Sequence, residues 1–365
     1  MATPANKGIL PDRMIAALAQ SGGILPAYEF DPDQIQPASL DLRLGDVAYR
    51  VRASFLPGPR TTVAERVEEL TLHKINLEDS AVLETGCVYI VPLIESLALP
   101  DDISAAANPK SSTGRLDVFT RVIADETRGF DRIRAGYHGP LYAEISPKTF
   151  PVLVREGSRL SQIRFRRGQA LLDAAALRAL HERERLTDDA DADLGDGIAV
   201  GVDLSGLGPD GLVGYRAKRH TGLIDVERRG GYDLVDYWEP MAARKDRSLI
   251  LDPDEFYILA SKEAVQVPPD YAAEMVPFDP LVGEFRVHYA GFFDPGFGYE
   301  GAGGRGARAV LEVRSREVPF ILEHGQIVGR LVYEKMLARP EKLYGQGIGS
   351  NYQAQGLKLS KHFRT

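Results

Sequence analysis

The sequence predicts a mainly β protein that contains two copies of one structural unit. Short β-like runs such as Val88–Val91 alternate with Pro, Gly and Asp about every eight to twelve residues, a rhythm typical of a β-barrel or sandwich. A shift of 168 positions places Val88–Val91 on Phe256–Leu259, and the same shift places Glu144 on Glu312. Since the offset is constant along the segment, the chain is interpreted as a tandem duplication.

A few short helices interrupt this pattern. Apolar residues recur at helical spacing over Pro11–Gln20, and Gly22-Gly23 then stops the helix. A second helix is expected within Gln169–Glu184. The acidic stretch Asp188–Asp196 follows it, and because it lacks the spacing of an EF-hand loop, it is interpreted as a solvated linker. The expected organisation is a first unit over residues 1–185, an acidic linker over 186–198 and a second unit over 199–365.

Bulk composition excludes several classes of protein. The 365 residues carry a formal net charge of −8, which argues against a nucleic-acid-binding protein with a basic surface. Cys87 is the one cysteine, so neither an intrachain disulfide nor a zinc–thiolate cluster is expected. The segment Met1–Gln20 lacks the apolar core of a signal peptide, and no run of about 18 apolar residues occurs. We therefore expect a cytoplasmic protein without nucleic-acid or membrane partners.

A candidate phosphate-binding segment lies in the first copy, at Pro109–Leu116. Lys110, Ser111, Ser112 and Arg115 bring two hydroxyls and two cations together, and phosphate groups are bound by such donors. On its own, this short segment favours a surface turn over a phosphate site.

Two candidate segments lie in the second copy. His288–Phe297 precedes Leu311-Glu312-Val313, where a Glu stands between apolar residues of a predicted strand. An inward-pointing Glu312 would have a raised pKa that suits a general base, whereas alternation also allows it to face solvent. The tail Tyr344–Phe363 is rich in Gly and Gln and is either disordered or ordered over a charged ligand, with Lys358 and Lys361 supplying charge.

Together these segments resemble the dCTP deaminase and dUTPase superfamily. Lys110–Leu116 is similar to its phosphate motif, a basic residue followed by Ser-Ser-x-x-x-Arg-Leu. Tyr289–Phe297 with Leu311-Glu312 is similar to its nucleoside motif and the Leu-Glu that follows. Tyr352–Gly356 resembles the closing Tyr-Gln-x-Gln-x-Gly, and Gln36–Leu44 resembles the first-strand signature. The resemblance covers most of the chain and implies two tandem dUTPase-like β-barrel or β-clip units.

Each copy departs from the family pattern in a different place. The first copy has Ile123–Glu126 where the nucleoside motif should be, and the second has Asp279–Gly283 in place of the Ser-Ser motif. The second nucleoside loop also runs long through Gly298–Arg308, which is interpreted as a hairpin extension. In the superfamily, active sites lie between neighbouring barrels. The resemblance therefore implies a division of labour, in which the first copy grips phosphates and the second holds the nucleoside.

The resemblance also implies roles for individual residues. Glu312 would be the general base and then the acid, with the Ser111 hydroxyl and the Ala290 carbonyl holding the attacking water. The alternative places the site on Glu144 and Ala124, within first copies of different chains. The expected substrate contacts are made by Lys110, Ser112, Arg115, Gly291, Phe292, Asp294, Tyr352, Gln355 and Lys358. Magnesium would arrive with the triphosphate, without a protein metal site and without zinc.

The implied activity is hydrolytic deamination of dCTP to dUTP and ammonia, which supplies dUTP for thymidylate synthesis. One alternative is a bifunctional dCTP deaminase and dUTP pyrophosphatase, or a dUTPase. Another is a non-catalytic regulatory protein that binds a nucleotide. Inhibition by dTTP and assembly into a homo-oligomer are expected from the family.

Overall fold

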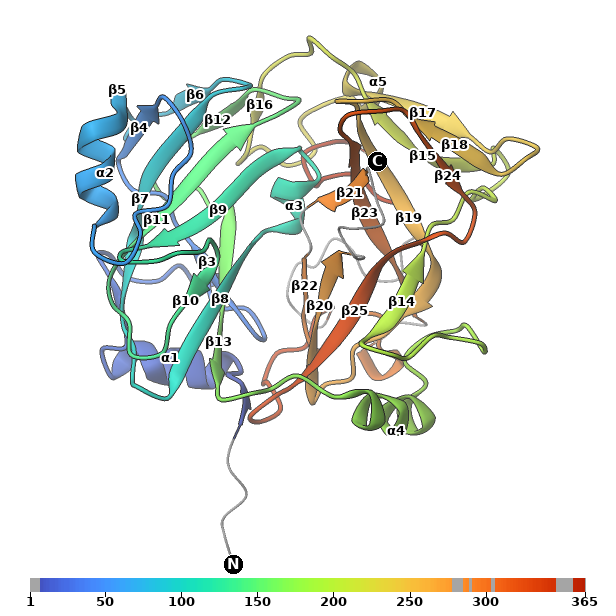
Figure 1. Ribbon diagram of the computed structural model, residues 1–365, viewed down its shortest axis with the longest axis horizontal. Helices are drawn as coiled ribbons and strands as arrows, with labels where there is room; N and C mark the ends of the chain where they lie inside the picture. Colours follow the sequence, from blue (N-terminus) through green and yellow to red (C-terminus); the bar gives the residue numbers. More distant parts are fainter. Residues whose placement is uncertain (1–6, 278–284, 289–290, 303–305, 346–356, 365) are drawn as a thin grey trace, which may run out of the picture. The chain divides into compact units, whose positions relative to one another are not determined.

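The computed structural model describes residues 7–277, 285–288, 291–302, 306–345 and 357–364. It is mainly β, as the sequence predicts, and it divides into two compact units (Figure 1). Unit 1 consists of residues 1–170, 220–232 and 361–365, and unit 2 consists of residues 171–219 and 233–360.

Unit 1 is a set of mainly antiparallel sheets with three short helices in its described part. Its main sheet has the strand order β5-β4-β7-β11-β9, and a second sheet has the order β1-β13-β8-β10 with β3 paired to β13. The elements are β1 (Gly8–Ile9), α1 (Asp12–Gln20), β2 (Ile24–Pro26), β3 (Leu40–Leu42), β4 (Val47–Val51), α2 (Val63–Leu70), β5 (Thr71–Asn76), β6 (Ala81–Leu83), β7 (Val88–Ala98), β8 (Ile103–Pro109), α3 (Ser111–Gly114), β9 (Val118–Ala124), β10 (Arg132–Ile133), β11 (His138–Pro147), β12 (Val152–Val154), β13 (Ser161–Arg167) and β16 (Ile224–Asp225).

Unit 2 repeats this arrangement. Its sheet β17-β15-β19-β23-β21 corresponds to β5-β4-β7-β11-β9, and its sheet β14-β25-β20-β22 corresponds to β3-β13-β8-β10. The tandem duplication predicted from the sequence is therefore confirmed. The elements are α4 (Ala174–Glu184), β14 (Ile198–Gly201), β15 (Leu212–Ala217), α5 (Leu234–Tyr237), β17 (Trp238–Ala242), β18 (Ser248–Leu251), β19 (Phe256–Val265), β20 (Tyr271–Pro277), β21 (Phe285–His288), β22 (Phe292–Phe293), η1 (Glu300–Ala302), β23 (Ala307–Ser315), β24 (Phe320–Glu323) and β25 (Ile327–Lys335).

Both predicted helices are present. Helix α1 ends at Gln20, and Gly22 adopts a φ of +82° just beyond it, a conformation that glycine reaches without the steric cost of a side chain. Helix α4 covers only the later part of the range predicted for the second helix. It begins at Ala174 because the Asp173 carboxylate accepts a hydrogen bond from the Ala176 amide at 2.8 Å and caps the first turn.

Two segments from the second half of the sequence, residues 220–232 and 361–365, belong to unit 1. Strand β16 pairs in parallel with β12, with Ile224 opposite Val152. Ile224 and Val226 are buried, so this segment contributes to the core of unit 1. The division by contacts thus differs from the sequence-based boundaries near residues 185 and 199, because these segments leave their own half of the sequence to pack elsewhere.

The acidic stretch over Asp188–Asp196 is bound to unit 2. The Asp188 amide donates to the Ala264 carbonyl, and its carboxylate accepts from the Ala264 amide. Asp193 forms an ion pair with Arg330 at 2.6 Å. These contacts attach the stretch to unit 2, and its side chains are exposed or partly exposed.

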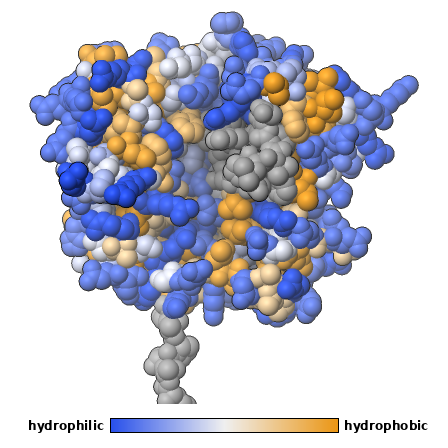
Figure 2. Space-filling model, in the orientation of Figure 1, coloured by the Kyte–Doolittle hydropathy of each residue, from blue (hydrophilic) through white to orange (hydrophobic). Residues whose placement is uncertain are grey.

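Hydrophilic residues cover most of the face shown in Figure 2. None of the helices in the described part of the chain is long and apolar enough to cross a membrane.

Candidate active site

The predicted phosphate motif forms one tight turn between two strands of unit 1. Strand β8 ends at Pro109, and the Lys110 amide then donates to the Leu160 carbonyl. The Lys110 carbonyl in turn accepts from the amides of Thr113 and Gly114, which closes α3. Ser112 and Arg115 are buried, whereas Lys110 and Ser111 are partly exposed. The structure thus brings the predicted hydroxyls and cations together on one rigid turn.

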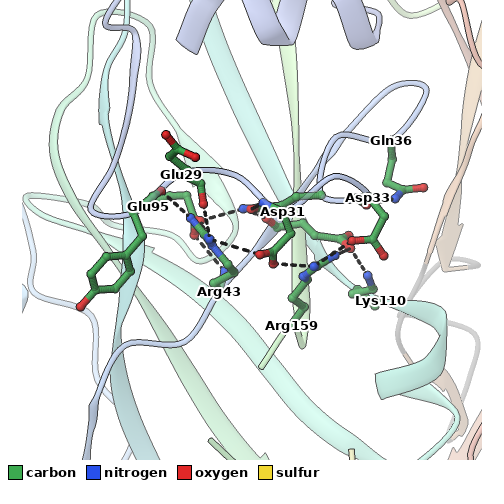
Figure 3. Close-up of polar contacts among 11 residues, drawn as sticks. Glu29, Asp31, Asp33, Gln36, Arg43, Glu95, Lys110 and Arg159 are labelled. Atoms are coloured by element: carbon green, nitrogen blue, oxygen red, sulfur yellow. Dashed lines mark hydrogen bonds and ion pairs between the residues drawn. The ribbon is translucent and has the colours of Figure 1, made fainter. Parts of the chain in front are cut away.

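A buried carboxylate, Asp41 on β3, holds the Lys110 side chain. The Lys110 ammonium forms an ion pair with Oδ2 of Asp41, and Arg159 approaches the same oxygen at 3.6 Å (Figure 3). Asp41 is only 1% exposed, so its charge is balanced almost wholly by these neighbours. The phosphate motif is therefore fixed to the sheet through a side chain as well as through the backbone.

Arg159 extends this contact into a chain of ion pairs. It binds Asp31 at 2.5 Å and Asp33 at 2.9 Å. Burial would by itself raise the pKa of Asp33, but the hydrogen bond and charge of Arg159 outweigh it and lower that pKa. The same two aspartates, together with Asp41, raise the pKa of Arg159 against the opposing effect of burial.

The chain of ion pairs continues from Asp31 to Arg43, whose guanidinium lies 3.8 Å from the Asp31 carboxylate. Arg43 binds Glu95 through Nε at 2.8 Å, and the Arg43 amide donates to the other oxygen of Glu95 at 2.8 Å (Figure 3). The buried Gln34 donates to the same carboxylate at 2.7 Å. Glu95 is fully buried, so Arg43 and Gln34 supply the hydrogen bonds that its carboxylate would otherwise make with water.

Glu144, the counterpart of Glu312 in unit 1, is held by an arginine. Glu144 on β11 lies opposite Arg121 on β9, and the Arg121 Nε donates to its carboxylate at 3.1 Å. The guanidinium also lies 3.4 Å from the ring centroid of Phe130 and 4.6 Å from that of Phe119. Two aromatic faces and a buried carboxylate therefore hold Arg121 in one orientation.

In unit 1, the segment Ile123–Glu126 stands where the nucleoside motif should be, and it makes contacts that stabilise the fold. The Asp125 carboxylate accepts a hydrogen bond from the Val63 amide at 2.7 Å, at the first turn of α2. Burial raises the pKa of Asp125, and this hydrogen bond partly opposes the rise. Ala124, the predicted alternative to Ala290, ends strand β9 beside this capping contact. In the alternative site, Glu144 is thus bonded to Arg121, and Ala124 ends the strand next to Asp125.

Glu312 lies on β23, in the middle of the main sheet of unit 2. It stands opposite Ile258 of β19 on one side and His288 of β21 on the other. It is only 6% exposed, so the interpretation in which it faces solvent is wrong. A carboxylate in the interior of a sheet is expensive to bury, which favours a functional role over a surface role.

The nucleoside loop of unit 2 is packed by aromatic rings. Phe292 is buried on β22, and the Gly291 carbonyl accepts from the Met275 amide at 3.2 Å. Phe297 stacks edge-on against Phe293, and Tyr344 packs against Phe297 at 5.6 Å between ring centroids. Asp294 is partly exposed, and its carbonyl accepts from the Phe297 amide. The described part of the loop is therefore held by aromatic packing, and Tyr344 at the start of the tail packs against it.

Several predicted residues lie outside the described part of the chain. These are Ala290, Tyr352 and Gln355, together with Asp279–Gly283 and part of Gly298–Arg308. Lys358 is described as a partly buried residue of unit 2.

Sequence reasoning did not assign a role to the residues that support the phosphate motif. Asp41 lies within the first-strand signature Gln36–Leu44, so the signature pointed at its position without indicating its partner. Arg159 carries no sequence signal of this kind, and neither does Arg121, which holds Glu144. Each arginine is recognised only by the carboxylate that the fold places beside it.

These observations define a class of protein: a duplicated, mainly β protein with a turn of hydroxyls and cations in one unit and a buried strand carboxylate in the other. The 2′-deoxycytidine 5′-triphosphate deaminase N-terminal domain matches residues 6–169, and the C-terminal domain of the same family matches residues 173–363. The chain therefore belongs to the dCTP deaminase family, and it is an enzyme of that type.

Individual relatives agree with this assignment. The chain is 63% identical to the protein in a crystal structure of 2′-deoxycytidine 5′-triphosphate deaminase from Agrobacterium tumefaciens, with a TM-score of 0.88 over 92% of this chain and 100% of that one. It is 32% identical over 163 residues to a dCTP deaminase from Haloarcula marismortui, covering 43% of this chain and 79% of the relative. It is 30% identical over 158 residues to a dUMP-forming dCTP deaminase from Pseudarthrobacter chlorophenolicus, covering 43% and 78%.

Proposed function

We propose that this dCTP deaminase converts dCTP and water to dUTP and ammonia without zinc, using Glu312 of unit 2 as the base and the phosphate motif of unit 1 as the triphosphate grip. The observation that carries this proposal is the complementary use of the two copies. Unit 1 keeps Ser111, Ser112 and Arg115, but its strand carboxylate is held by Arg121. Unit 2 keeps a buried strand carboxylate in Glu312.

The proposed chemistry needs one carboxylate that accepts and returns protons. Glu312 accepts a proton from water as the water oxygen attacks C4 of cytosine, and it passes this proton to the ring nitrogen N3. It then moves the proton of the new hydroxyl to the amino group, so that ammonia leaves and a C4 carbonyl forms. The Ser111 hydroxyl and the Ala290 carbonyl would hold the attacking water in line. The net change is the replacement of the amino group by oxygen, with no change in oxidation state.

The proposed grip on the triphosphate uses Lys110, Ser112 and Arg115. A rigid turn of hydroxyls and cations suits phosphate oxygens, and it does not suit direct coordination of a cation. Magnesium would therefore enter bound to the triphosphate, where it neutralises phosphate charge. On the nucleoside side, Asp294 would contact the 3′-hydroxyl of the deoxyribose, beside Gly291 and Phe292. Tyr352, Gln355 and Lys358 of the tail would cover the ligand and exclude water.

The zinc-free mechanism is supported by the cysteine count. Zinc-dependent nucleobase deaminases bind their metal through a His and paired cysteines, or through three cysteines. The whole sequence has one cysteine, Cys87, so such a ligand set cannot be assembled within one chain.

A second candidate function is further hydrolysis of dUTP to dUMP. It is favoured by the relatives, since the Pseudarthrobacter chlorophenolicus protein and others are described as dUMP-forming. An enzyme that stops at dUTP supplies dUTP for thymidylate synthesis, whereas an enzyme that also hydrolyses dUTP supplies dUMP directly. We further propose a cytoplasmic homo-oligomer that dTTP inhibits.

Product analysis tests the proposed function. The purified chain is incubated with dCTP, magnesium and a zinc-selective chelator, and nucleotides, ammonia and pyrophosphate are quantified. Equal amounts of ammonia and dUTP support the deaminase, whereas dUMP with pyrophosphate identifies the bifunctional enzyme. Loss of activity in the chelator, restored by zinc, contradicts the zinc-free mechanism. Nucleotide binding without any product identifies a regulatory protein.

A further inference from the structure

Two cations approach the same oxygen of a buried carboxylate beside the phosphate motif. The Lys110 ammonium forms an ion pair with Oδ2 of Asp41, and Nη1 of Arg159 lies 3.6 Å from this oxygen (Figure 3). Asp41 is 1% exposed, and its backbone pairs with Gln162 of β13, so the carboxylate is held in place while the two cations stand on long side chains. The geometry therefore allows Asp41 to exchange one cation for the other.

The other oxygen of the Asp41 carboxylate lacks a donor. Oδ1 is buried and has no hydrogen-bond partner among the residues that the structure describes. A buried carboxylate oxygen without a donor destabilises the folded protein, so a donor that moves closer to it is favoured. A guanidinium can bind both oxygens of a carboxylate at once, whereas an ammonium acts as a single point charge. Asp41 therefore has an unused oxygen that suits the fork of Arg159.

Arg159 is held beside Asp41 independently of Lys110. Its Nη2 donates to Asp31 at 2.5 Å and to Asp33 at 2.9 Å. Its Nη1 is the nitrogen near Asp41, and it donates no hydrogen bond to any residue in the described part of the chain. Two aspartates thus fix the guanidinium and leave one nitrogen for Asp41. A short approach of Nη1 would convert the ion pair with Asp41 into a hydrogen bond.

The two copies of the fold provide an internal comparison for these charges. The residues of unit 2 at the places of Asp41, Lys110 and Arg159 are Ala199, Phe278 and Ile327. Strand pairing gives the first correspondence, and the shift of 168 positions gives the other two. By contrast, the buried Glu95 has a buried counterpart, Glu263, in unit 2. Both units thus keep the core glutamate, whereas the three charges accompany the phosphate motif of unit 1.

We propose that Arg159 is a positioning residue for the triphosphate grip, which takes over Asp41 when the substrate draws Lys110 from this carboxylate to a phosphate oxygen. The inference rests on the proposed role of the phosphate motif in binding dCTP. Without a second cation, Lys110 would leave a buried charge unpaired when it binds phosphate, and this cost would weaken binding. Arg159 keeps that charge paired and needs no contact of its own with the substrate.

The expected effect of removing Arg159 falls on KM. Arg159→Met keeps an apolar stem and removes the replacement cation, so KM for dCTP should rise about tenfold. The value of kcat should stay within about twofold, because the saturated enzyme has already paired Lys110 with phosphate and the proposed base, Glu312, is unchanged. Binding of deoxycytidine, measured by calorimetric titration, should not change, since a ligand without phosphate leaves Lys110 on Asp41.

A double-mutant cycle with Asp41→Asn separates this role from direct binding of the substrate. Asp41→Asn removes the buried charge, so Lys110 leaves nothing unpaired. In this background, Arg159→Met should change KM by less than about twofold. An equal rise of KM in both backgrounds overturns the proposal, because Arg159 would then act on the substrate directly. If Arg159→Met alone does not fold, the same comparison of Asp41→Asn with the double variant still decides, since a tenfold difference in KM between these two overturns the proposal.

Arg167→Met is the matched control. Arg167 ends β13 in the same unit and forms an ion pair with the exposed Asp102 at 2.8 Å. Its removal should leave KM for dCTP unchanged. A rise of KM equal to that in Arg159→Met overturns the proposal, because the effect would then follow the net charge of unit 1.

Arg115→Ala distinguishes failure of this inference from failure of the proposed site. If Arg115→Ala raises KM for dCTP and Arg159→Met does not, only the role of Arg159 is wrong. If neither variant changes KM, the triphosphate does not bind at the phosphate motif, and both proposals are wrong.

Discussion

Arg121 and Glu144 face each other across strands β9 and β11 of unit 1, where the arginine holds the carboxylate in an ion pair. At the corresponding position of unit 2, the residue opposite Glu312 is His288. The two copies therefore place different residues opposite the equivalent strand glutamates.

Arg115 tests the assignment of the phosphate motif. Arg115→Ala should weaken dCTP binding by about 10- to 100-fold, because a charge-assisted contact with phosphate is lost. Binding of deoxycytidine should be spared, since it carries no phosphate. Calorimetric titration with both ligands measures the two effects. Equal losses for the two ligands would show that Arg115 supports the fold.

The buried pair of Arg43 and Glu95 should be important for the stability of unit 1. Arg43→Met leaves the fully buried Glu95 carboxylate without its cation, and we expect a loss of about 3–5 kcal/mol. The exposed pair of Arg66 and Glu69 provides the control, since Arg66→Met should cost less than about 1 kcal/mol.

Urea unfolding can assign this loss to one unit. Trp238, the one tryptophan in the sequence, lies in unit 2, whereas circular dichroism reports both units. Arg43→Met should lower the midpoint of the dichroism transition more than that of the Trp238 fluorescence transition. Equal shifts of the two transitions contradict a local role in unit 1.

Residues 361–364 bind the segment 224–232 of unit 1 through backbone hydrogen bonds, and we call the two together the C-terminal clasp. His362 should make this clasp sensitive to acid. Burial lowers the pKa of His362 from 6.5 to about 4, so the folded clasp holds a neutral imidazole. The released clasp binds a proton below pH 6.5, and stability is therefore lost as the pH falls from about 6.5 to 4. The expected loss at pH 5 is about 2 kcal/mol.

Hydrogen exchange of the C-terminal peptide measures this effect. Protection of residues 361–364, corrected for the intrinsic exchange rate, should fall between pH 7 and pH 5. In His362→Gln, which does not titrate, protection should be lower at pH 7 and should not change with pH. A pH-dependent loss that persists in this variant would assign the titration to another group.

The duplicated β fold could be predicted because its signals are local or periodic. The alternation of β-like runs and turn residues indicated strands, and the constant offset from Val88–Val91 to Phe256–Leu259 indicated two copies. The structure confirms both, since β7 and β19 occupy the same place in equivalent sheets. The helix after Pro11 was also predictable, because its apolar spacing and the glycines after it are all in one short segment.

The contacts that hold the site residues in place could not be predicted, because they join residues that are far apart in the sequence. Asp41 and Lys110 are 69 positions apart, and nothing in either segment indicates the other. The same holds for the C-terminal clasp, in which His362 bonds Val226 across 136 positions. Short polar segments such as Gln36–Leu44 and Lys358–Phe363 show which residue types are present, but only the fold shows which charges share a site.

The rate of ammonia release by Glu312→Gln is the most direct test of the central claim. The substitution keeps the shape of the side chain and removes its basicity. Glu312→Gln should therefore lose activity by at least about 100-fold and still bind dCTP with an affinity close to that of the unmodified enzyme. Glu144→Gln, measured in parallel, should keep most of the activity. An inactive Glu144→Gln beside an active Glu312→Gln would contradict the account and move the reaction centre to unit 1.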